Sequence, residues 1–227
     1  LLLADVNRII TPSICLLSWK GGDWTIEDQF KKNVDGIITW GGEDMAASYA
    51  KNLAPNVKLI QHGPKISFHV ISKSQESDMS DSFFDNIVRD IYMWDQSACA
   101  NSQNLFIEFG TDINKFIKGL ELAFERVTCS RGDLSGDEYT EIIKDYQLGL
   151  YEEFKTGNKV SQGKDFLICY DSSLSLTPSA LNRSVKIKEF VNIDELSAML
   201  AVFKMYLQTC GLVVSHQERG HYIDALD

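Results

Sequence analysis

One cysteine of this chain lies in a sequence context that suits covalent chemistry. Cys99 is flanked by small and polar residues, which would leave a thiol on a turn open to an acyl group: Ser97, Ala98, Ala100, Asn101 and Ser102. A thiolate nucleophile needs access and activation, commonly by a helix N-terminus or an adjacent base. No histidine lies near Cys99 in the sequence, and most free cysteines are inert buried thiols. Spacing alone therefore leaves a nucleophile and a structural thiol both open.

A Gly-Gly turn after an expected strand is the second candidate. Trp40, Gly41 and Gly42 precede Glu43 and Asp44, which begin an expected helix. Two glycines let a backbone approach a phosphate, and the free N–H groups of a helix N-terminus bind anions. The full dinucleotide fingerprint is absent, and two carboxylates beside a phosphate repel it unless they point away. The turn is interpreted either as a cofactor pyrophosphate contact or as a tight turn whose acidic residues complement the helix dipole.

Among the histidines, His62 is the one we place near a site. It lies between two expected strands, in the segment Gln61-His62-Gly63-Pro64-Lys65. His69 alternates with apolar residues in an expected strand and is interpreted as structural. His216 and His221 make no metal-ligand spacing with a third residue, so we predict no metal site.

Composition excludes several classes of function. The chain has 227 residues, of which 22 are Lys or Arg and 32 are Asp or Glu, which gives a formal net charge of −10. Binding to nucleic acid or to an anionic membrane surface requires basic clusters, and none is present. The apolar runs are far shorter than the ~20 residues that span a bilayer. Leu1-Leu2-Leu3-Ala4 lacks the basic start and the apolar core of a signal peptide.

The cysteines indicate a reducing compartment. They are odd in number, widely scattered and form no C-x-x-C pair: Cys15, Cys99, Cys129, Cys169 and Cys210. This pattern favours reduced thiols in a cytoplasm over a disulfide framework or a zinc site.

Hydrophobic patterning predicts an α/β fold. We expect strands at residues 14–19, 34–40, 57–60, 66–71, 105–109, 165–170 and 184–191. We expect helices through residues 29–32, with Thr25 as the cap, and at 43–53, 82–92, 112–126 and 193–208. Residues 72–81 are expected to form a loop, and 130–163 two helices with loops. Strands that alternate with helices indicate βαβ units around a parallel sheet.

Several segments, in this order, resemble the long-chain acyl-CoA reductases, the fatty-acid reductase subunits of bacterial bioluminescence within the aldehyde dehydrogenase superfamily. They are Trp40-Gly41-Gly42, Gln61-His62-Gly63-Pro64-Lys65-Ile66-Ser67-Phe68, Asp90-Ile91, Asp95-Gln96-Ser97-Ala98-Cys99 with Ser102-Gln103, and a later segment with Asn182-Arg183-Ser184. The resemblance implies an aldehyde dehydrogenase-like fold, with residues 1–65 as the C-terminal half of a Rossmann-like cofactor domain. Residues 66–227 would form the catalytic thiol domain, cut from a longer enzyme.

The resemblance also implies the chemistry. Cys99 would attack a fatty acyl thioester, from acyl-CoA or an acyl-protein donor, and hydride from NADPH would convert the acyl-Cys99 thioester to a long-chain aldehyde. Trp40, Gly41 and Gly42 would contact the cofactor, and the residues from Gln61 to Lys65 would line the site. The Cys99 backbone N–H, with an Asn upstream of this chain, would form the oxyanion hole. We also expect acyl-activating or acyl-transferring protein partners and a homo-oligomer.

One departure from the wider superfamily favours reduction over oxidation. Gln61 stands where aldehyde-oxidising members carry a general-base Glu, and an amide cannot deprotonate water. The Glu that those members place on the nicotinamide ribose has no match near residues 180–185. Three alternatives remain. They are a short-chain CoA-acylating aldehyde dehydrogenase using NAD, a non-catalytic docking subunit for an acyl-activating partner, and a cysteine hydrolase with His62 as its base.

Overall fold

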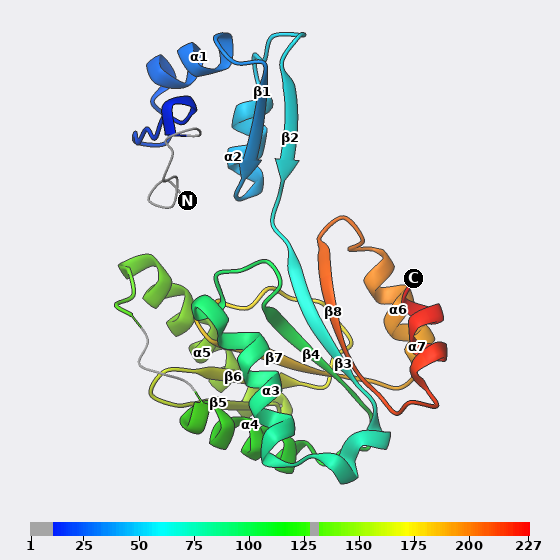
Figure 1. Cartoon of the computed structure of the whole chain (residues 1–227). Helices are drawn as coiled ribbons and strands as arrows, with labels where there is room; N and C mark the ends of the chain where they lie inside the picture. The colour runs from blue at the N-terminus through cyan, green and yellow to red at the C-terminus, as the bar shows by residue number, and fades with distance from the viewer. Residues whose placement is uncertain (1–10, 128–131) are drawn as a thin grey trace. The chain divides into compact units, whose positions relative to one another are not determined.

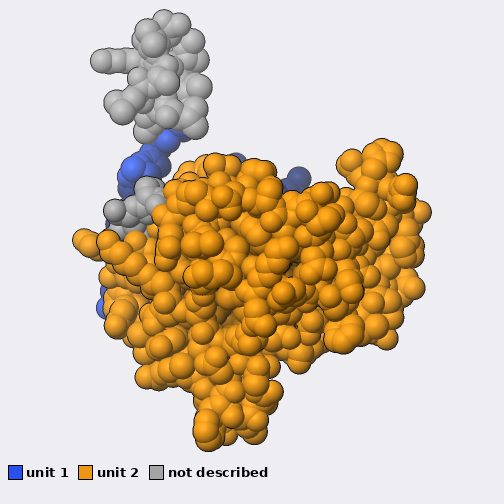
Figure 2. Space-filling model, turned by 90° about the horizontal axis from the view of Figure 1, so that it is seen from below, with its two compact units in different colours: residues 1–64 blue, residues 65–227 orange. Residues whose placement is uncertain are grey.

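The computed structural model describes residues 11–127 and 132–227. The predictions for Leu1-Leu2-Leu3-Ala4 and for Cys129 lie outside the described residues. The chain divides into two compact units, Leu1–Pro64 and Lys65–Asp227, which Figure 1 traces by element and Figure 2 colours separately. The expected domain boundary, between residues 65 and 66, lies next to this division. The roles assigned to the two domains stay predictions.

The first unit is built around a parallel pair of strands. Its elements are η2 (Thr11–Ser13), α1 (Trp24–Lys32), β1 (Gly36–Trp40), α2 (Glu43–Ala50) and β2 (Lys58–His62). The strand expected at residues 14–19 is wrong: this segment forms no strand, and the side chains of Leu16 and Leu17 are exposed. An apolar run becomes a buried strand only beside a partner, and β1 pairs with β2 in a two-stranded sheet.

The start of α1 differs by two positions from the expectation that Thr25 is its cap. Asp23 is the N-cap, and its carboxylate accepts hydrogen bonds from the Thr25 N–H and the Thr25 hydroxyl. A capping side chain accepts from the amide two or three positions on, so Thr25 is the partner of the cap.

The second unit contains a six-stranded sheet in the order β5-β6-β7-β4-β3-β8, parallel except for the β5–β6 pair. Its strands are β3 (Ile66–Ile71), β4 (Ser102–Glu108), β5 (Lys159–Gln162), β6 (Leu167–Asp171), β7 (Ser184–Phe190) and β8 (Leu207–Val213). Its helices are η3 (Lys73–Asp78), α3 (Asp81–Tyr92), η4 (Met93–Gln96), α4 (Ile113–Val127), α5 (Gly136–Thr156), α6 (Ile193–Ala201) and α7 (Arg219–Leu226).

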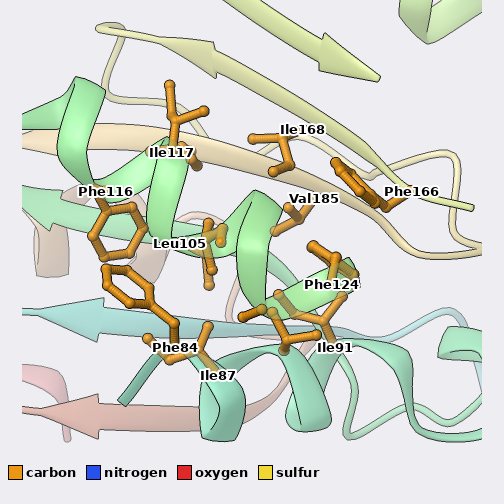
Figure 3. Packing of buried hydrophobic residues seen from close by; sticks show 14 of the residues in the cluster. Phe84, Ile87, Ile91, Leu105, Phe116, Ile117, Phe124, Phe166, Ile168 and Val185 are labelled. Atoms are coloured by element: carbon orange, nitrogen blue, oxygen red, sulfur yellow. The ribbon is translucent and has the colours of Figure 1, made fainter. Parts of the chain in front are cut away.

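Two hydrophobic cores cover the two faces of this sheet. On β4, Leu105 and Ile107 point into one core and Phe106 points into the other, as the two-residue period of a strand requires. The first core is closed by α3 and α4, and Figure 3 shows Phe84, Phe116 and Phe124 of these helices packed over the strands. The second core is closed by α6 and α7. Strand β4, which follows the turn that carries Cys99, is therefore fixed from both sides.

The region expected to hold two helices holds one helix and a strand. Helix α5 begins at a capping box, in which the Ser135 hydroxyl accepts from the Glu138 N–H and the Glu138 carboxylate accepts from the Ser135 N–H. It ends 21 residues later at Gly157, whose φ of 80° is the left-handed conformation that favours glycine. Strand β5 follows and pairs with β6.

The helix expected at residues 193–208 ends at Ala201, and the residues after it form a turn and then β8. The predicted continuation is wrong because the apolar side chains beyond Ala201 do not extend the buried face: Val202 and Met205 are exposed. Strand β8 instead takes the open edge of β3, with Phe68 opposite Cys210. The loop expected at residues 72–81 contains the 3-10 helix η3.

Candidate active site

The sequence-predicted site residues fall in both units. In the first unit, Trp40, Gly41 and Gly42 join β1 to α2, while Gln61 and His62 end β2 and precede Gly63 and Pro64. In the second unit, Lys65 precedes β3, and Cys99 lies in the turn between η4 and β4. Because the placement of one unit against the other is not determined, each group is described separately.

In the first unit, the structure brings Trp40 and His62 together. They are opposite each other in the β1–β2 register, and their rings stack at 5.1 Å between centroids with 9° between planes. The Gly41 N–H donates to the His62 carbonyl at 3.3 Å, which extends the strand pairing into the turn. The indole is 69% exposed. The carboxyl ends of these parallel strands thus present a flat aromatic surface.

The start of α2 has backbone donors without a side-chain cap. Gly42 is the N-cap and supplies no capping hydrogen bond. A side chain at Gly42 would meet no atom within 4 Å, whereas one at Gly41 would meet the flexible end of Met45. The acidic residues of the first turn are Glu43 and Asp44. This arrangement offers open space beside a helix N-terminus, with negative charge on its first turn.

Gln61 joins β2 to α2. Its side-chain Nε2 donates to the Ala46 carbonyl at 2.9 Å. The amide carries no titratable group, so the residue at this position holds the helix and does not act as a base.

In the second unit, Cys99 is exposed on a tightly held turn. Its carbonyl accepts a hydrogen bond from the buried Ser67 hydroxyl at 2.6 Å, and the same hydroxyl accepts from the Thr209 N–H at 3.1 Å. Ser67 therefore joins the cysteine turn to both β3 and β8. Asn101 holds the preceding residue: its Oδ1 accepts from the Ala98 N–H at 2.9 Å.

The backbone ahead of Cys99 adopts a conformation that ordinary residues avoid. Trp94, Asp95 and Gln96 have φ values of 50°, 50° and 65°, each in the left-handed region. Such residues cost about 1–2 kcal/mol each unless surrounding contacts hold them. A second left-handed run, residues 181–183, lies across from the first. The two runs are held together by side chains.

Arg183 and Gln96 make that connection. The fully buried Arg183 pairs with Asp95, with its Nε 2.7 Å from Oδ1, and lies over the Tyr92 ring. The Gln96 side chain accepts from the Ser184 N–H at 3.0 Å and donates to the Ser184 carbonyl at 2.8 Å. The segment before Cys99 is thus fastened to the start of β7.

His69 is structural, as expected. Its Nδ1 lies 2.5 Å from the Ser102 hydroxyl and its Nε2 lies 3.2 Å from Asp90, so both ring nitrogens are engaged. A Cβ at Gly211 would lie 2.4 Å from the imidazole, so the ring fills the space beside β8. Lys65, expected to line the site, donates from Nζ to the Met205 carbonyl at 2.7 Å, which anchors its side chain to the turn before β8.

Two other thiols are poorly suited to nucleophilic chemistry. Desolvation raises the pKa of Cys169 to about 11 and that of Cys210 to about 12. The thiolate form of each is scarce at neutral pH. Within residues 11–127 and 132–227, no cluster of His, Cys, Asp and Glu has the arrangement of a metal site.

The residues that hold the segment around Cys99 in place were not predicted from the sequence. Gln96, Arg183 and Ser184 stand inside the motifs that carry the resemblance, but their contacts join residues 88 positions apart. Ser67 carries the same limitation, since its partners Cys99 and Thr209 come from other strands and turns. A motif identifies such residues without revealing what they contact.

The fold of this chain is shared with solved structures. It is that of the aldehyde dehydrogenases: the chain superposes on aldehyde dehydrogenase KauB from Pseudomonas aeruginosa with a TM-score of 0.65 and 13% identity, over 85% of this chain and 43% of that one. A gamma-glutamyl-gamma-aminobutyraldehyde dehydrogenase from Burkholderia cenocepacia gives a TM-score of 0.65 at 12% identity, with the same coverage. The expected fold class is confirmed.

The chain belongs to the acyl-CoA reductase (LuxC) family, whose model matches residues 1–227. It is similar to the long-chain acyl-protein thioester reductase of Vibrio harveyi, with 29% identity over 103 residues, 45% of this chain and 21% of that protein. A second such reductase, from Photobacterium leiognathi, is 26% identical over 195 residues, 84% of this chain and 39% of that protein. The resemblance inferred from the motifs is confirmed, and the chain spans less than half of these relatives.

In the part of the chain that the structure describes, none of the helices combines the length and apolar character needed to cross a membrane.

Proposed function

We propose that this chain is the thiol-bearing part of an NADPH-dependent acyl-CoA reductase that converts a long-chain fatty acyl thioester to its aldehyde. The observation that carries the proposal is the exposed Cys99 on a turn braced from several strands, in a chain of the acyl-CoA reductase family. The acyl donor is fatty acyl-CoA or an acylated protein, the latter in line with the names of the related reductases.

Cys99 performs the covalent step. Its thiolate attacks the thioester carbonyl, a new C–S bond forms, and the donor's thiolate leaves with the electron pair of the broken C–S bond. The Cys99 amide N–H has no acceptor in the described part of the chain, so it is free to donate to the developing oxyanion. After reduction of the acyl carbon, the bond to Cys99 breaks and the thiolate is regenerated as the aldehyde leaves.

The first unit fits a nicotinamide cofactor, which supplies the hydride when bound. The open space beside Gly42, at an uncapped helix start, suits a pyrophosphate approached by backbone. The exposed face of Trp40 suits a planar ring. Glu43 and Asp44 must point away from the phosphates for this placement to hold. We propose NADPH as the reductant.

Gln61 supports reduction as the direction of the reaction. A carboxylate at this position in oxidising relatives of the superfamily would activate water, whereas the Gln61 amide holds α2 through the Ala46 carbonyl. An amide at this position supplies no base for hydrolysis, which favours an acyl thioester that persists until reduction.

The proposal is tested by measuring aldehyde formation with the complete protein. We expect tetradecanoyl-CoA with NADPH to be reduced faster than acetyl-CoA with NADH, and Cys99→Ala to lose turnover while Cys210→Ala retains it. A preference for acetyl-CoA and NADH would instead select the short-chain dehydrogenase. Full turnover in Cys99→Ala would rule out the covalent mechanism.

A further inference from the structure

Asn101 occupies a position that controls the peptide bond leading into Cys99. Its backbone N–H donates to the Ala98 carbonyl at 3.0 Å, while its side-chain Oδ1 accepts from the Ala98 N–H at 2.9 Å. Both peptide groups of Ala98 are thereby held by one residue. Asn101 is 4% exposed, and its side-chain hydrogen bond to the Ala98 N–H is half-buried.

The remaining amide donor of Asn101 anchors this arrangement to α3. Helix α3 ends at Tyr92, and the carbonyls of its last turn lack partners within the helix. The Asn101 Nδ2 donates to one of them, the Asp90 carbonyl, at 2.9 Å. Asn101 therefore satisfies a helix end and orders the cysteine turn with the same side chain.

Peptide geometry fixes the direction of the Cys99 N–H. In a trans peptide the C=O and the next N–H point in opposite directions. Because the Asn101 backbone N–H holds the Ala98 carbonyl, the Cys99 N–H points away from Asn101, and it meets no acceptor within the described ranges. The Asn101 side chain keeps this turn in place through its hydrogen bonds to the Ala98 N–H and the Asp90 carbonyl. On the other side of Cys99, Ser67 holds the carbonyl. The Cys99 amide is thus preorganised and still available.

We infer that Asn101 is a positioning residue that aims the Cys99 N–H at the oxyanion formed during acyl transfer. This inference rests on the proposed function, in which Cys99 is the nucleophile. Preorganised donors of this kind stabilise the transition state because no reorientation is needed when charge develops. Asn101 acts through the backbone of its neighbours, since its hydrogen bonds go to Ala98 and Asp90.

The test compares two reactions of the Cys99 thiol in the complete protein. Transfer of a tetradecanoyl group from CoA develops an oxyanion, whereas alkylation by iodoacetamide forms its C–S bond by displacement of iodide and develops none. Asn101→Ala keeps the backbone hydrogen bond to the Ala98 carbonyl but removes both side-chain hydrogen bonds, so the turn can shift. We expect kcat for acyl transfer to fall about 100-fold, with KM nearly unchanged, and the alkylation rate of Cys99 to change only a few-fold.

Two further variants make the result decisive. Asn101→Asp keeps the acceptor for the Ala98 N–H and loses the donor to Asp90, so kcat should recover toward that of the wild type. Asn104→Ala is the matched control, since Asn104 is another buried asparagine of the same segment, with Nδ2 bound to the Thr177 carbonyl. We expect it to leave kcat close to that of the wild type.

Wild-type kcat in Asn101→Ala would overturn the inference, and so would equal losses in Asn101→Ala and Asn104→Ala or a parallel loss of alkylation. If Asn101→Ala fails to fold, the kcat of Asn101→Asp decides. A kcat about 100-fold below that of the wild type in Asn101→Asp would count against the inference. Undiminished acyl transfer in Cys99→Ala would overturn the proposed function itself.

Discussion

The two units of this chain obtain their geometry in different ways. Among its described residues the first unit buries two apolar side chains, Ile37 and Val57, and leaves large ones such as Leu16 and Ile60 exposed. The second unit fills two cores on opposite faces of a six-stranded sheet. The first unit thus depends on strand pairing and caps, and the second on apolar packing.

The difference matches the chemistry assigned to each unit. The proposed nucleophile stands on the unit with the denser core, where strain in the turn before Cys99 is held by Arg183 and Gln96. The proposed cofactor contacts at Trp40 and Gly42 are largely backbone and an exposed ring. Precise placement of a nucleophile requires rigid support, whereas a phosphate contact requires backbone access.

The largest expected effect is in the first core of the second unit. Phe124 is fully buried and stacks on Phe166 at 4.8 Å between ring centroids. We expect Phe124→Ala to lower the free energy of unfolding by about 3–5 kcal/mol, because it leaves a cavity in a packed core. Urea unfolding measures this. Leu122→Ala on the same helix, 43% exposed, is the control, and equal losses in both would contradict the packing described.

The next effect concerns a buried charged side chain of β7. Lys188 is 2% exposed and pairs with Asp171. Burial alone would raise the pKa of Asp171, but hydrogen bonds from Lys188 and Ser173 together outweigh it and lower that pKa. We expect Asp171→Asn to cost about 2 kcal/mol, less than a fully buried pair because the carboxylate is partly exposed. Combining it with Lys188→Met should recover stability. If the double variant does not regain stability, the unpaired charge of Lys188 is not the cause of the loss in Asp171→Asn.

A smaller effect depends on pH. Hydrogen bonds from the Ser74 and Ser215 hydroxyls lower the pKa of Glu218 in the folded chain. Its contribution to stability is complete above the unfolded value, about 4.3, and is lost as the pH falls through the lower folded value. We expect Glu218→Gln to flatten the acid side of the stability profile, measured by urea midpoints below pH 5. An unchanged profile would show that these bonds do not stabilise the carboxylate.

The smallest effect sharpens the contrast between the units. Leu16 is 89% exposed in the first unit. We expect Leu16→Ser to change the free energy of unfolding by less than about 0.5 kcal/mol, as for surface positions generally. Thermal unfolding monitors the change. A loss comparable to that of Phe124→Ala would show that the first unit is also held by apolar packing.

Sequence reasoning recovered the parts of the fold that local patterns encode. The strands around residues 36–40, 66–71 and 184–190 follow from apolar runs. It failed where pairing partners decide the structure. Residues 14–19 find no strand to pair with, and the helix expected at residues 193–208 ends at Ala201, because the residues from Leu207 onward pair with the open edge of β3. Residues 130–163 were expected to form two helices with loops, and they contain one helix, between the Ser135 cap and Gly157, followed by β5.

The same distinction, between local patterns and long-range contacts, applies to the candidate site. Cys99 and the Trp40-Gly41-Gly42 turn were predicted from residue types and from the resemblance to a family. The support of Cys99 by Ser67, Asn101 and Arg183 depends on long-range contacts and on left-handed backbone that no residue type announces. The motif identifies the residue types that could react, and the fold fixes their geometry.

Trapping the acyl group tests the covalent role of Cys99 most directly. The complete protein is incubated with tetradecanoyl-CoA without a reductant, and intact mass with peptide mapping locates any adduct. We predict a single acyl thioester on Cys99, absent from Cys99→Ala and discharged to aldehyde when NADPH is added. No adduct on Cys99, or an adduct there that only hydrolyses in the presence of NADPH, would contradict the proposed mechanism.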